Sequence, residues 1–191
     1  INVSEFFRNP EQWKLVQEQL LPNLMKNTKE LKIWSAACST GEEPYTIAMI
    51  LSTLLPLNKI TVHATDIDDG AMAKAKLGIY SQASLKNVPP TLKEKFFKKN
   101  NEGKYEISND IKSRIVVKKH NLLKDPFISN CDLIVCRNVM IYFTDEAKNQ
   151  IYQNFSDSLK ADGVLFVGAT EQIISPQQFD LKSLKTFFYG K

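Results

Sequence analysis

The sequence predicts an α/β fold in which helices cover a doubly wound, mainly parallel sheet. Two observations predict it. Short apolar runs rich in β-branched residues alternate along the chain with segments whose apolar residues recur every three or four positions. The composition is that of a globular domain, with 43% hydrophobic and 24% charged residues. We therefore expect residues 1–191 to form a single domain around one continuous sheet.

The expected elements follow one another along the chain. An amphipathic helix covers residues 10 to about 26, where Pro22 should bend or restart it. The expected strands are 31–36, 60–65, 131–136 and 164–168, and the later helices are 42–55, 69–77 and 145–160. This alternation places helices on both faces of a parallel sheet. Ligands of such folds bind beyond the carboxyl ends of the strands, where the strand order reverses.

Residues 80–120 interrupt this alternation. A lysine-rich helix after "NVPP" is followed by "YEISND" and "RIVVKKH", two alternating runs that could pair antiparallel. We therefore expect a small antiparallel subdomain inserted over residues 80–120. The last residues, "LKSLKTFFYGK", have an aromatic end that favours a final antiparallel edge strand.

Charge and cysteine content exclude several functions. Three cysteines without C-x-x-C spacing and two isolated histidines predict neither a disulfide framework nor a metal site. They are typical of a reducing cytoplasm. A net charge of +4 does not support nucleic-acid binding. No apolar run approaches the roughly 20 residues that a membrane span needs. We expect a soluble, cytoplasmic protein that neither binds nucleic acid nor inserts into a membrane; its oligomeric state is not indicated.

Residues 34–45, "WSAACSTGEEPY", form the first candidate site. The expected strand ends in small residues, among them Ala36, and then two adjacent carboxylates, Glu42 and Glu43, begin a helix. The turn lacks the repeated glycines or the lysine of a phosphate loop. Stabilisation of the helix end would explain the two acids but not the small residues beside them. A cationic or amino-bearing ligand lying over the strand end would explain both.

The next expected strand ends in "ATDID". An acidic residue at this place can accept hydrogen bonds from a ribose diol, and Asp66 stands 24 residues after Glu42, close to the usual separation. Asp66 or Asp68 could instead cap the following helix. A ligand with a ribose, a positive amino group and no phosphate is indicated. S-adenosylmethionine has all three properties.

Motifs along nearly the whole chain resemble the catalytic domain of the CheR family, the chemotaxis receptor glutamate methyltransferases. They are "NVSEFFR", "WSAACSTGEEPYTIAM", "ATDID" with "GIY", "HNLL", "DLIVCRNVMIYF" and "GVLFVGATE". The resemblance implies a methyltransferase sheet with a small inserted antiparallel subdomain. It implies S-adenosylmethionine as cofactor and S-adenosylhomocysteine as product. The implied reaction transfers a methyl group to glutamates in the cytoplasmic region of chemotaxis receptors and makes methyl esters.

The resemblance also implies site residues. It places Asn2, Ser4 and Arg8 at the cofactor, on an N-terminal segment that folds over it. The other implied cofactor-binding residues are Ala36, Glu42, Asp66, Asn121, Leu122, Arg137 and Asn138. Among these, Glu42 would meet the methionine amino group, Asp66 the ribose, and Asn121 with Leu122 the adenine. Tyr142 would lie near the departing methyl group.

Orientation, and not proton transfer, is the expected catalytic principle. The acceptor carboxylate has a reference pKa of about 4.3, so it is an anion at neutral pH and needs no base. Arg8 would steer a carboxylate by a forked hydrogen bond, and Tyr142 would fix the sulfonium end. Alternatives remain: Arg8 could pair with Glu5 or Glu11 on the surface, Arg137 could tie its own loop, and Tyr142 could be a core aromatic. Asn138 and Asn121 could serve only in a cap or turn.

The sequence departs from the family pattern at two places. Ser4 stands where threonine is frequent and keeps the hydroxyl group. Residues 168–171, "GATE", stand where the family often has G-H-S-E, so no histidine is available there for acid–base work. The alternative function is a catalytically inactive, cofactor-binding docking module of the same fold. Such a module could discard Arg8 and Tyr142, and both are present.

Overall fold

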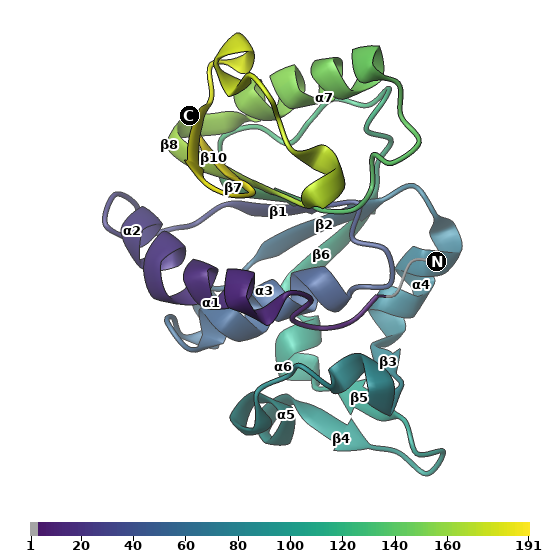
Figure 1. The fold of residues 1–191 in the computed structure, drawn as a ribbon. Coiled ribbons are helices and arrows are strands. Elements are labelled where there is room, and N and C mark those ends of the chain that lie inside the picture. The colour runs from purple at the N-terminus through teal and green to yellow at the C-terminus, as the bar shows by residue number, and fades with distance from the viewer. Residues whose placement is uncertain (1–3) are drawn as a thin grey trace.

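The computed structural model describes residues 4–191 as a central sheet with helices on both faces (Figure 1). Within these residues, seven strands form the main sheet in the order β6-β2-β1-β7-β8-β10-β9. The strands are β1 (Ile33–Ala36), β2 (Val62–Asp66), β6 (Ile115–Lys119), β7 (Cys131–Cys136), β8 (Leu159–Val167), β9 (Lys182–Lys185) and β10 (Phe188–Gly190). The first five are parallel, and β10 pairs antiparallel with β8 and β9. The predicted doubly wound, mainly parallel sheet is confirmed.

The strand order reverses at β1. The chain passes from β1 to β2 on one side, while β7 pairs with the other side of β1. Side chains of β1 alternate between the faces, so Ile33 belongs to the core beneath α3 (Glu42–Ser52) and Trp34 to the core beneath α7 (Asp145–Ser158). Both faces of the strand are therefore apolar, as a buried parallel strand requires.

Helices on one face come from the N-terminal half. The first is α1 (Pro10–Leu15), which continues through a π-helical turn, η1 (Val16–Leu20), into α2 (Leu21–Met25). Figure 1 shows this stretch and α3 on one side of the sheet and α7 on the other. Pro22 lacks the N–H of a regular helix and crowds the preceding turn, and a π-helical widening just before it relieves that crowding. The helical stretch therefore continues through Pro22, with a π-helical turn before it. Beyond α3, α4 (Asp69–Leu77) packs beside β2 and β6.

A separate three-stranded sheet lies below the main one in Figure 1. Its antiparallel order is β3-β5-β4, and short helices accompany it. The elements are β3 (Ile79–Tyr80), η3 (Gln82–Leu85), α5 (Pro90–Phe96), β4 (Phe97–Lys99), β5 (Tyr105–Ile107) and α6 (Asn109–Lys112). Phe6 joins it to the main body, with its ring edge-on to Tyr80 at 4.7 Å and to Phe97 at 5.2 Å.

The expected pairing inside this insertion is wrong. Tyr105–Ile107 pairs with β4 and β3, whereas 115–119 pairs parallel with β2 as an outer strand of the main sheet. The inserted sheet therefore ends at Ile107 and does not extend to residue 120. Alternation predicts a strand but not its partner. The exposed Lys118 and Lys119 suit an edge, where charged side chains discourage further pairing.

The C-terminal end also differs from expectation. The sequence predicts one antiparallel edge strand, whereas the structure has two, and the aromatic strand β10 lies between β8 and β9. Phe188 and Tyr189 of β10 are buried, while all four residues of β9 are exposed. The edge is therefore the lysine-containing strand β9.

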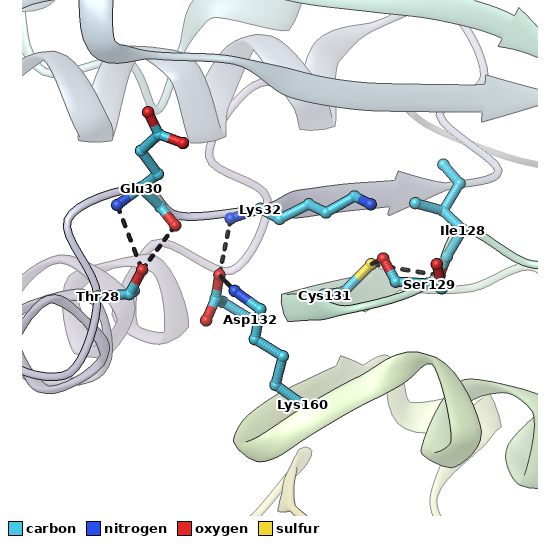
Figure 2. Close-up of polar contacts among 8 residues, drawn as sticks. All are labelled: Thr28, Glu30, Lys32, Ile128, Ser129, Cys131, Asp132 and Lys160. Atoms are coloured by element: carbon cyan, nitrogen blue, oxygen red, sulfur yellow. Dashed lines mark hydrogen bonds and ion pairs between the residues drawn. The ribbon is translucent and has the colours of Figure 1, made fainter.

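Polar contacts fix the strands at the end of the sheet opposite the carboxyl ends. The carboxylate of Asp132 accepts a hydrogen bond from the backbone N–H of Lys32 at 2.8 Å and pairs with Lys160 Nζ at 3.1 Å (Figure 2). This contact fixes the start of β1 beside the start of β7. None of the helices in the described part of the chain combines the length and apolar character of a membrane span.

Candidate active site

A cleft opens at the carboxyl ends of β1 and β7, where the strand order reverses. Five segments form its walls: residues 4–8, Trp13 of α1, the turn after β1, the first turns of α3, and the loop after β7. The cleft offers a volume of about 80 Å³ to water-sized molecules and is partly open to solvent. Of the predicted site residues, those that line it are Ser4, Arg8, Glu42, Arg137 and Asn138. Segments far apart in the sequence thus meet where the fold predicts a ligand.

The turn after β1 is tightly folded and held by the next strand. Ala37 and Ser39 have φ angles of 61° and 52°, in the left-handed region. Asp66 at the end of β2 accepts the backbone N–H of Ser39 at 2.8 Å and that of Asp68 at 2.9 Å. Gly41 has φ 98°, and a Cβ there would lie 2.9 Å from the hydroxyl oxygen of Tyr80. Only glycine therefore fits this position of the turn.

Two carboxylates project from the first turn of α3, where the helix dipole favours negative charge. Glu42 is buried and accepts a hydrogen bond from the Thr40 hydroxyl, and burial raises its pKa. Glu43 accepts a hydrogen bond from the Ser35 hydroxyl at 2.7 Å. Burial raises the pKa of Glu43 to about 7, although the Arg137 guanidinium and the Ser35 hydrogen bond pull it down. The sequence assigns no cofactor role to Glu43, but the structure places it in the cleft beside Glu42.

Arg137 at the end of β7 fastens the N-terminal segment. Its Nη2 donates to the backbone oxygen of Arg8 at 3.1 Å, to Asn9 Oδ1 at 2.6 Å and to Gln12 Oε1 at 3.2 Å. The guanidinium lies over two aromatic rings, 5.4 Å from the centroid of Trp13 and 4.9 Å from that of Phe166, and so makes cation–π interactions with both. Burial lowers the pKa of Arg137, and Glu43 opposes this shift. The alternative of a structural tie is partly right, but the tie reaches the N-terminal segment.

The remaining predicted residues of the nucleoside end follow neighbouring strands. Asp66 ends β2, and its backbone oxygen accepts the N–H of His120 at 2.9 Å. Asn121 and Leu122 come directly after His120 and are partly buried. Asn121 Oδ1 accepts the N–H of Leu123 at 2.9 Å, so its side chain also stabilises a turn. Asp66 and the 121–122 pair therefore lie next to each other, beside the cleft but not in its lining.

Two further predicted residues, Ala36 and Tyr142, lie outside the lining of the cleft, and Asn2 lies outside the described residues. Ala36 is buried in the core that faces α7, and its neighbour Ala37 lines the cleft in its place. Tyr142 is 94% exposed on the loop after β7. The alternative that Tyr142 is a core aromatic is therefore wrong, and its predicted position at the methyl group stays a prediction.

Residues of the cleft fit the amino-acid end of S-adenosylmethionine. The adjacent carboxylates Glu42 and Glu43 suit an amino group, and arginines suit a carboxylate. The buried Nε of Arg137 has no hydrogen-bond partner among residues 4–191, and a ligand carboxylate would satisfy it. Asp66 at the next strand end suits a ribose. The strand order and this site together define the class of S-adenosylmethionine-dependent methyltransferase folds.

Comparisons with known proteins give the family. The family model "CheR methyltransferase, SAM binding domain" matches residues 2–188. The chain belongs to this CheR methyltransferase family, and S-adenosylmethionine is its cofactor. The resemblance predicted from the motifs is confirmed.

Named relatives agree with this family, and solved structures agree with the methyltransferase fold. A "Chemotaxis protein methyltransferase" of Listeria monocytogenes is 40% identical over 192 residues, covering 100% of this chain and 73% of that protein. One of Borreliella burgdorferi is 37% identical, covering 90% of this chain and 65% of that protein. A "putative sarcosine dimethylglycine methyltransferase" from Galdieria sulphuraria has a TM-score of 0.57 at 12% identity, covering 93% and 63% of the two chains. The "DszA carbon methyltransferase" has a TM-score of 0.52 at 16% identity, covering 83% and 35%. At these identities the two structures show the fold alone.

Proposed function

We propose that this chain transfers a methyl group from S-adenosylmethionine to glutamate side chains in the cytoplasmic region of chemotaxis receptors, forming methyl esters. The observation that carries the proposal is that the family match over residues 2–188 includes every wall of the cleft. Relatives in several bacteria are named as chemotaxis methyltransferases, which supports methyl transfer in chemotaxis. The reaction would take place in the cytoplasm, where receptor signalling regions lie.

The proposed chemistry needs binding and orientation from the protein. When bound, S-adenosylmethionine supplies a methyl group on a positively charged sulfur. Glu42 and Glu43 would hold the amino group, and Asp66 the ribose hydroxyls. An acceptor glutamate is already ionised at neutral pH, so a protein base is not required. Holding the two reacting groups in line supplies a large part of the rate enhancement.

Arg8 is the proposed steering residue for a carboxylate. It lines the cleft from the N-terminal segment, and its backbone oxygen is held by Arg137. Phe7 N–H donates to the Thr46 hydroxyl of α3 at 3.0 Å, which fixes the same segment from the other side. Residues 4–8 therefore form a fixed strap along the cleft, which would limit access of water to a bound cofactor. Exclusion of water strengthens the attraction between an acceptor carboxylate and a positive charge.

The alternative, a catalytically inactive docking module, finds no support in the comparisons, because the relatives are named as methyltransferases. The two functions differ in one product. We would incubate the chain with methyl-labelled S-adenosylmethionine and a receptor cytoplasmic fragment, then expose the fragment to mild alkali. A methyl ester releases the label as methanol, whereas an amide or methylamine retains it. A fragment whose methyl-accepting glutamates are replaced by alanine is the matched control.

The proposal predicts alkali-labile label on the unaltered fragment and none on the control. Label that resists alkali would identify a different acceptor atom. A chain that binds the cofactor yet labels neither fragment would support the docking module.

A further inference from the structure

One buried carboxylate organises the loop that follows β7. Glu171 ends a short 3₁₀ helix, η4 (Ala169–Glu171), and is fully buried. Its Oε1 accepts the N–H of Asn138 at 2.6 Å and that of Gly168 at 3.1 Å. Its Oε2 accepts the N–H of Val139 at 3.2 Å and that of Met140 at 3.3 Å. Glu171 thus satisfies four backbone donors, three of them consecutive in the loop.

The surroundings of Glu171 are built for this contact. The Thr170 hydroxyl also donates to Oε2, and the Tyr152 hydroxyl of α7 donates to the backbone oxygen of Glu171 at 3.1 Å. A Cβ at position 168 would lie 2.8 Å from Asn138 Oδ1 and 2.9 Å from Glu171 Oε1, so only glycine lets the loop approach the carboxylate. Five donors from the described residues therefore occupy the two oxygens. Glu171 has little capacity left to bind a cofactor or substrate atom.

The loop leads from the cleft at the end of β7 to the start of α7. At its beginning, Asn138 has φ 59°, in the left-handed region that asparagine adopts more readily than most residues, and lines the cleft. At its far end, Ile141 and Tyr142 are exposed, by 46% and 94%. Large exposed side chains of this kind are available to contact a protein surface. The backbone between these two ends is the part that Glu171 holds.

We propose that Glu171 is a positioning residue for the acceptor protein. By binding the amides of residues 138–140 it keeps Asn138 at the cleft and presents Ile141 and Tyr142 to the arriving protein. Glu171 acts through the loop and touches neither cofactor nor acceptor. The identity of the acceptor as a receptor segment rests on the proposed function. The hold on the loop rests on the hydrogen bonds alone.

The substitution Glu171→Gln tests this role. Both oxygens accept backbone N–H groups, so an amide in either orientation turns its NH₂ group toward a donor. Glu171→Asp keeps two acceptor oxygens on a shorter side chain and should therefore retain part of the activity that Glu171→Gln loses. Glu146→Gln, an exposed glutamate in α7, is the matched control. The three variants are compared with the unaltered chain in kinetics, cofactor binding and amide hydrogen exchange.

We expect kcat/KM for a receptor cytoplasmic fragment to fall about 10-fold to 100-fold in Glu171→Gln, with a raised KM for the fragment. The affinity for S-adenosylhomocysteine, measured by calorimetry, should change by less than about 3-fold, because Asn138 is the only predicted cofactor-binding residue in the segment 138–140 that Glu171 holds. Amide exchange of a peptide covering residues 137–143 should accelerate about 10-fold or more, while exchange in β1 stays unchanged. Glu146→Gln should leave all three quantities unchanged.

Two results would overturn the inference. One is unchanged exchange of residues 137–143 in Glu171→Gln. The other is a loss of S-adenosylhomocysteine affinity as large as the loss of kcat/KM, which would indicate general damage to the site. If Glu171→Gln does not fold, amide exchange in the unaltered chain tests the inference instead. Rapid exchange of the amides of residues 138–140 would show that Glu171 does not hold them. Exchange and cofactor binding need no acceptor, so failure of the unaltered chain to label the fragment would contradict the proposed function alone.

Discussion

Glu43 provides a test of cleft electrostatics that needs no substrate. Glu43 as a whole is partly exposed, but burial of its carboxyl raises the pKa from 4.5 to about 7, against the opposing effects of the Arg137 charge and the Ser35 hydrogen bond. The substitution Glu43→Gln removes the titration and nearly preserves shape. The glutamine oxygen can still accept the hydrogen bond from the Ser35 hydroxyl, which is 2.7 Å from the carboxylate. The difference between the two proteins therefore isolates the cost of ionising Glu43.

The magnitude follows from the shift. A rise from 4.5 to about 7 is about 2.5 pKa units, and at about 1.36 kcal/mol for each unit it corresponds to at most about 3 kcal/mol. Because the pKa is raised in the folded state, folding retains a proton that the unfolded chain releases. The stabilising contribution is full below pH 4.5 and is lost as the pH rises to about 7. The free energy of unfolding of the unaltered protein should therefore fall relative to Glu43→Gln across this range.

Urea unfolding at a series of pH values measures this difference, with Glu146→Gln as an exposed control that should show little pH-dependent change. A difference between the unaltered protein and Glu43→Gln that is constant with pH would refute the reasoning. A difference that grows in favour of the unaltered protein as the pH rises would also refute it, because it would mean that attraction to Arg137 outweighs burial.

Three further substitutions test the other walls of the cleft. Asp66→Ala should weaken S-adenosylmethionine binding about 10-fold to 100-fold, because a charged acceptor of ribose hydroxyls is lost; unchanged affinity in calorimetry would contradict the role. Arg8→Ala should lower turnover far more than Lys98→Ala, an exposed lysine of the small sheet; equal losses in a labelled-methyl assay would remove Arg8 from the mechanism. Arg137→Met should keep the aromatic packing but release three hydrogen bonds, so amide exchange in residues 4–12 should accelerate about 10-fold with β7 unchanged; unchanged exchange would show that other contacts hold the strap.

Long periodic elements were predictable from the sequence because their pattern depends on the chain alone. Residues 69–77 and 131–136 form a helix and a strand with the predicted bounds, and the last long helix ends within two residues of its expected end. Strand partners were less predictable. Residues 115–119 and 105–107 both alternate, but the choice of neighbour depends on how β2 presents its free edge after folding.

The site residues also divide into those that the sequence could predict and those that it could not. Glu42 could be assigned to the cleft because the fold class brings strand ends together, and Arg8 because the family resemblance implies that the N-terminal segment folds over the cofactor. The hydrogen-bond partners of Arg137 could not be predicted, because its contact with Arg8 spans 129 positions of the chain. The role of Glu171 is visible only in the structure, where its carboxylate turns to the loop after β7. Its position in "GATE" gives no signal of that direction.

A crystal structure of the complex with S-adenosylhomocysteine tests the central claim most directly. The account predicts the nucleoside at the carboxyl ends of β1 and β7, with its amino group within hydrogen-bond distance of Glu42 or Glu43 and its ribose hydroxyls at Asp66. A ligand bound elsewhere, or a cleft that residues 4–8 fill with no space for the ligand, would contradict it.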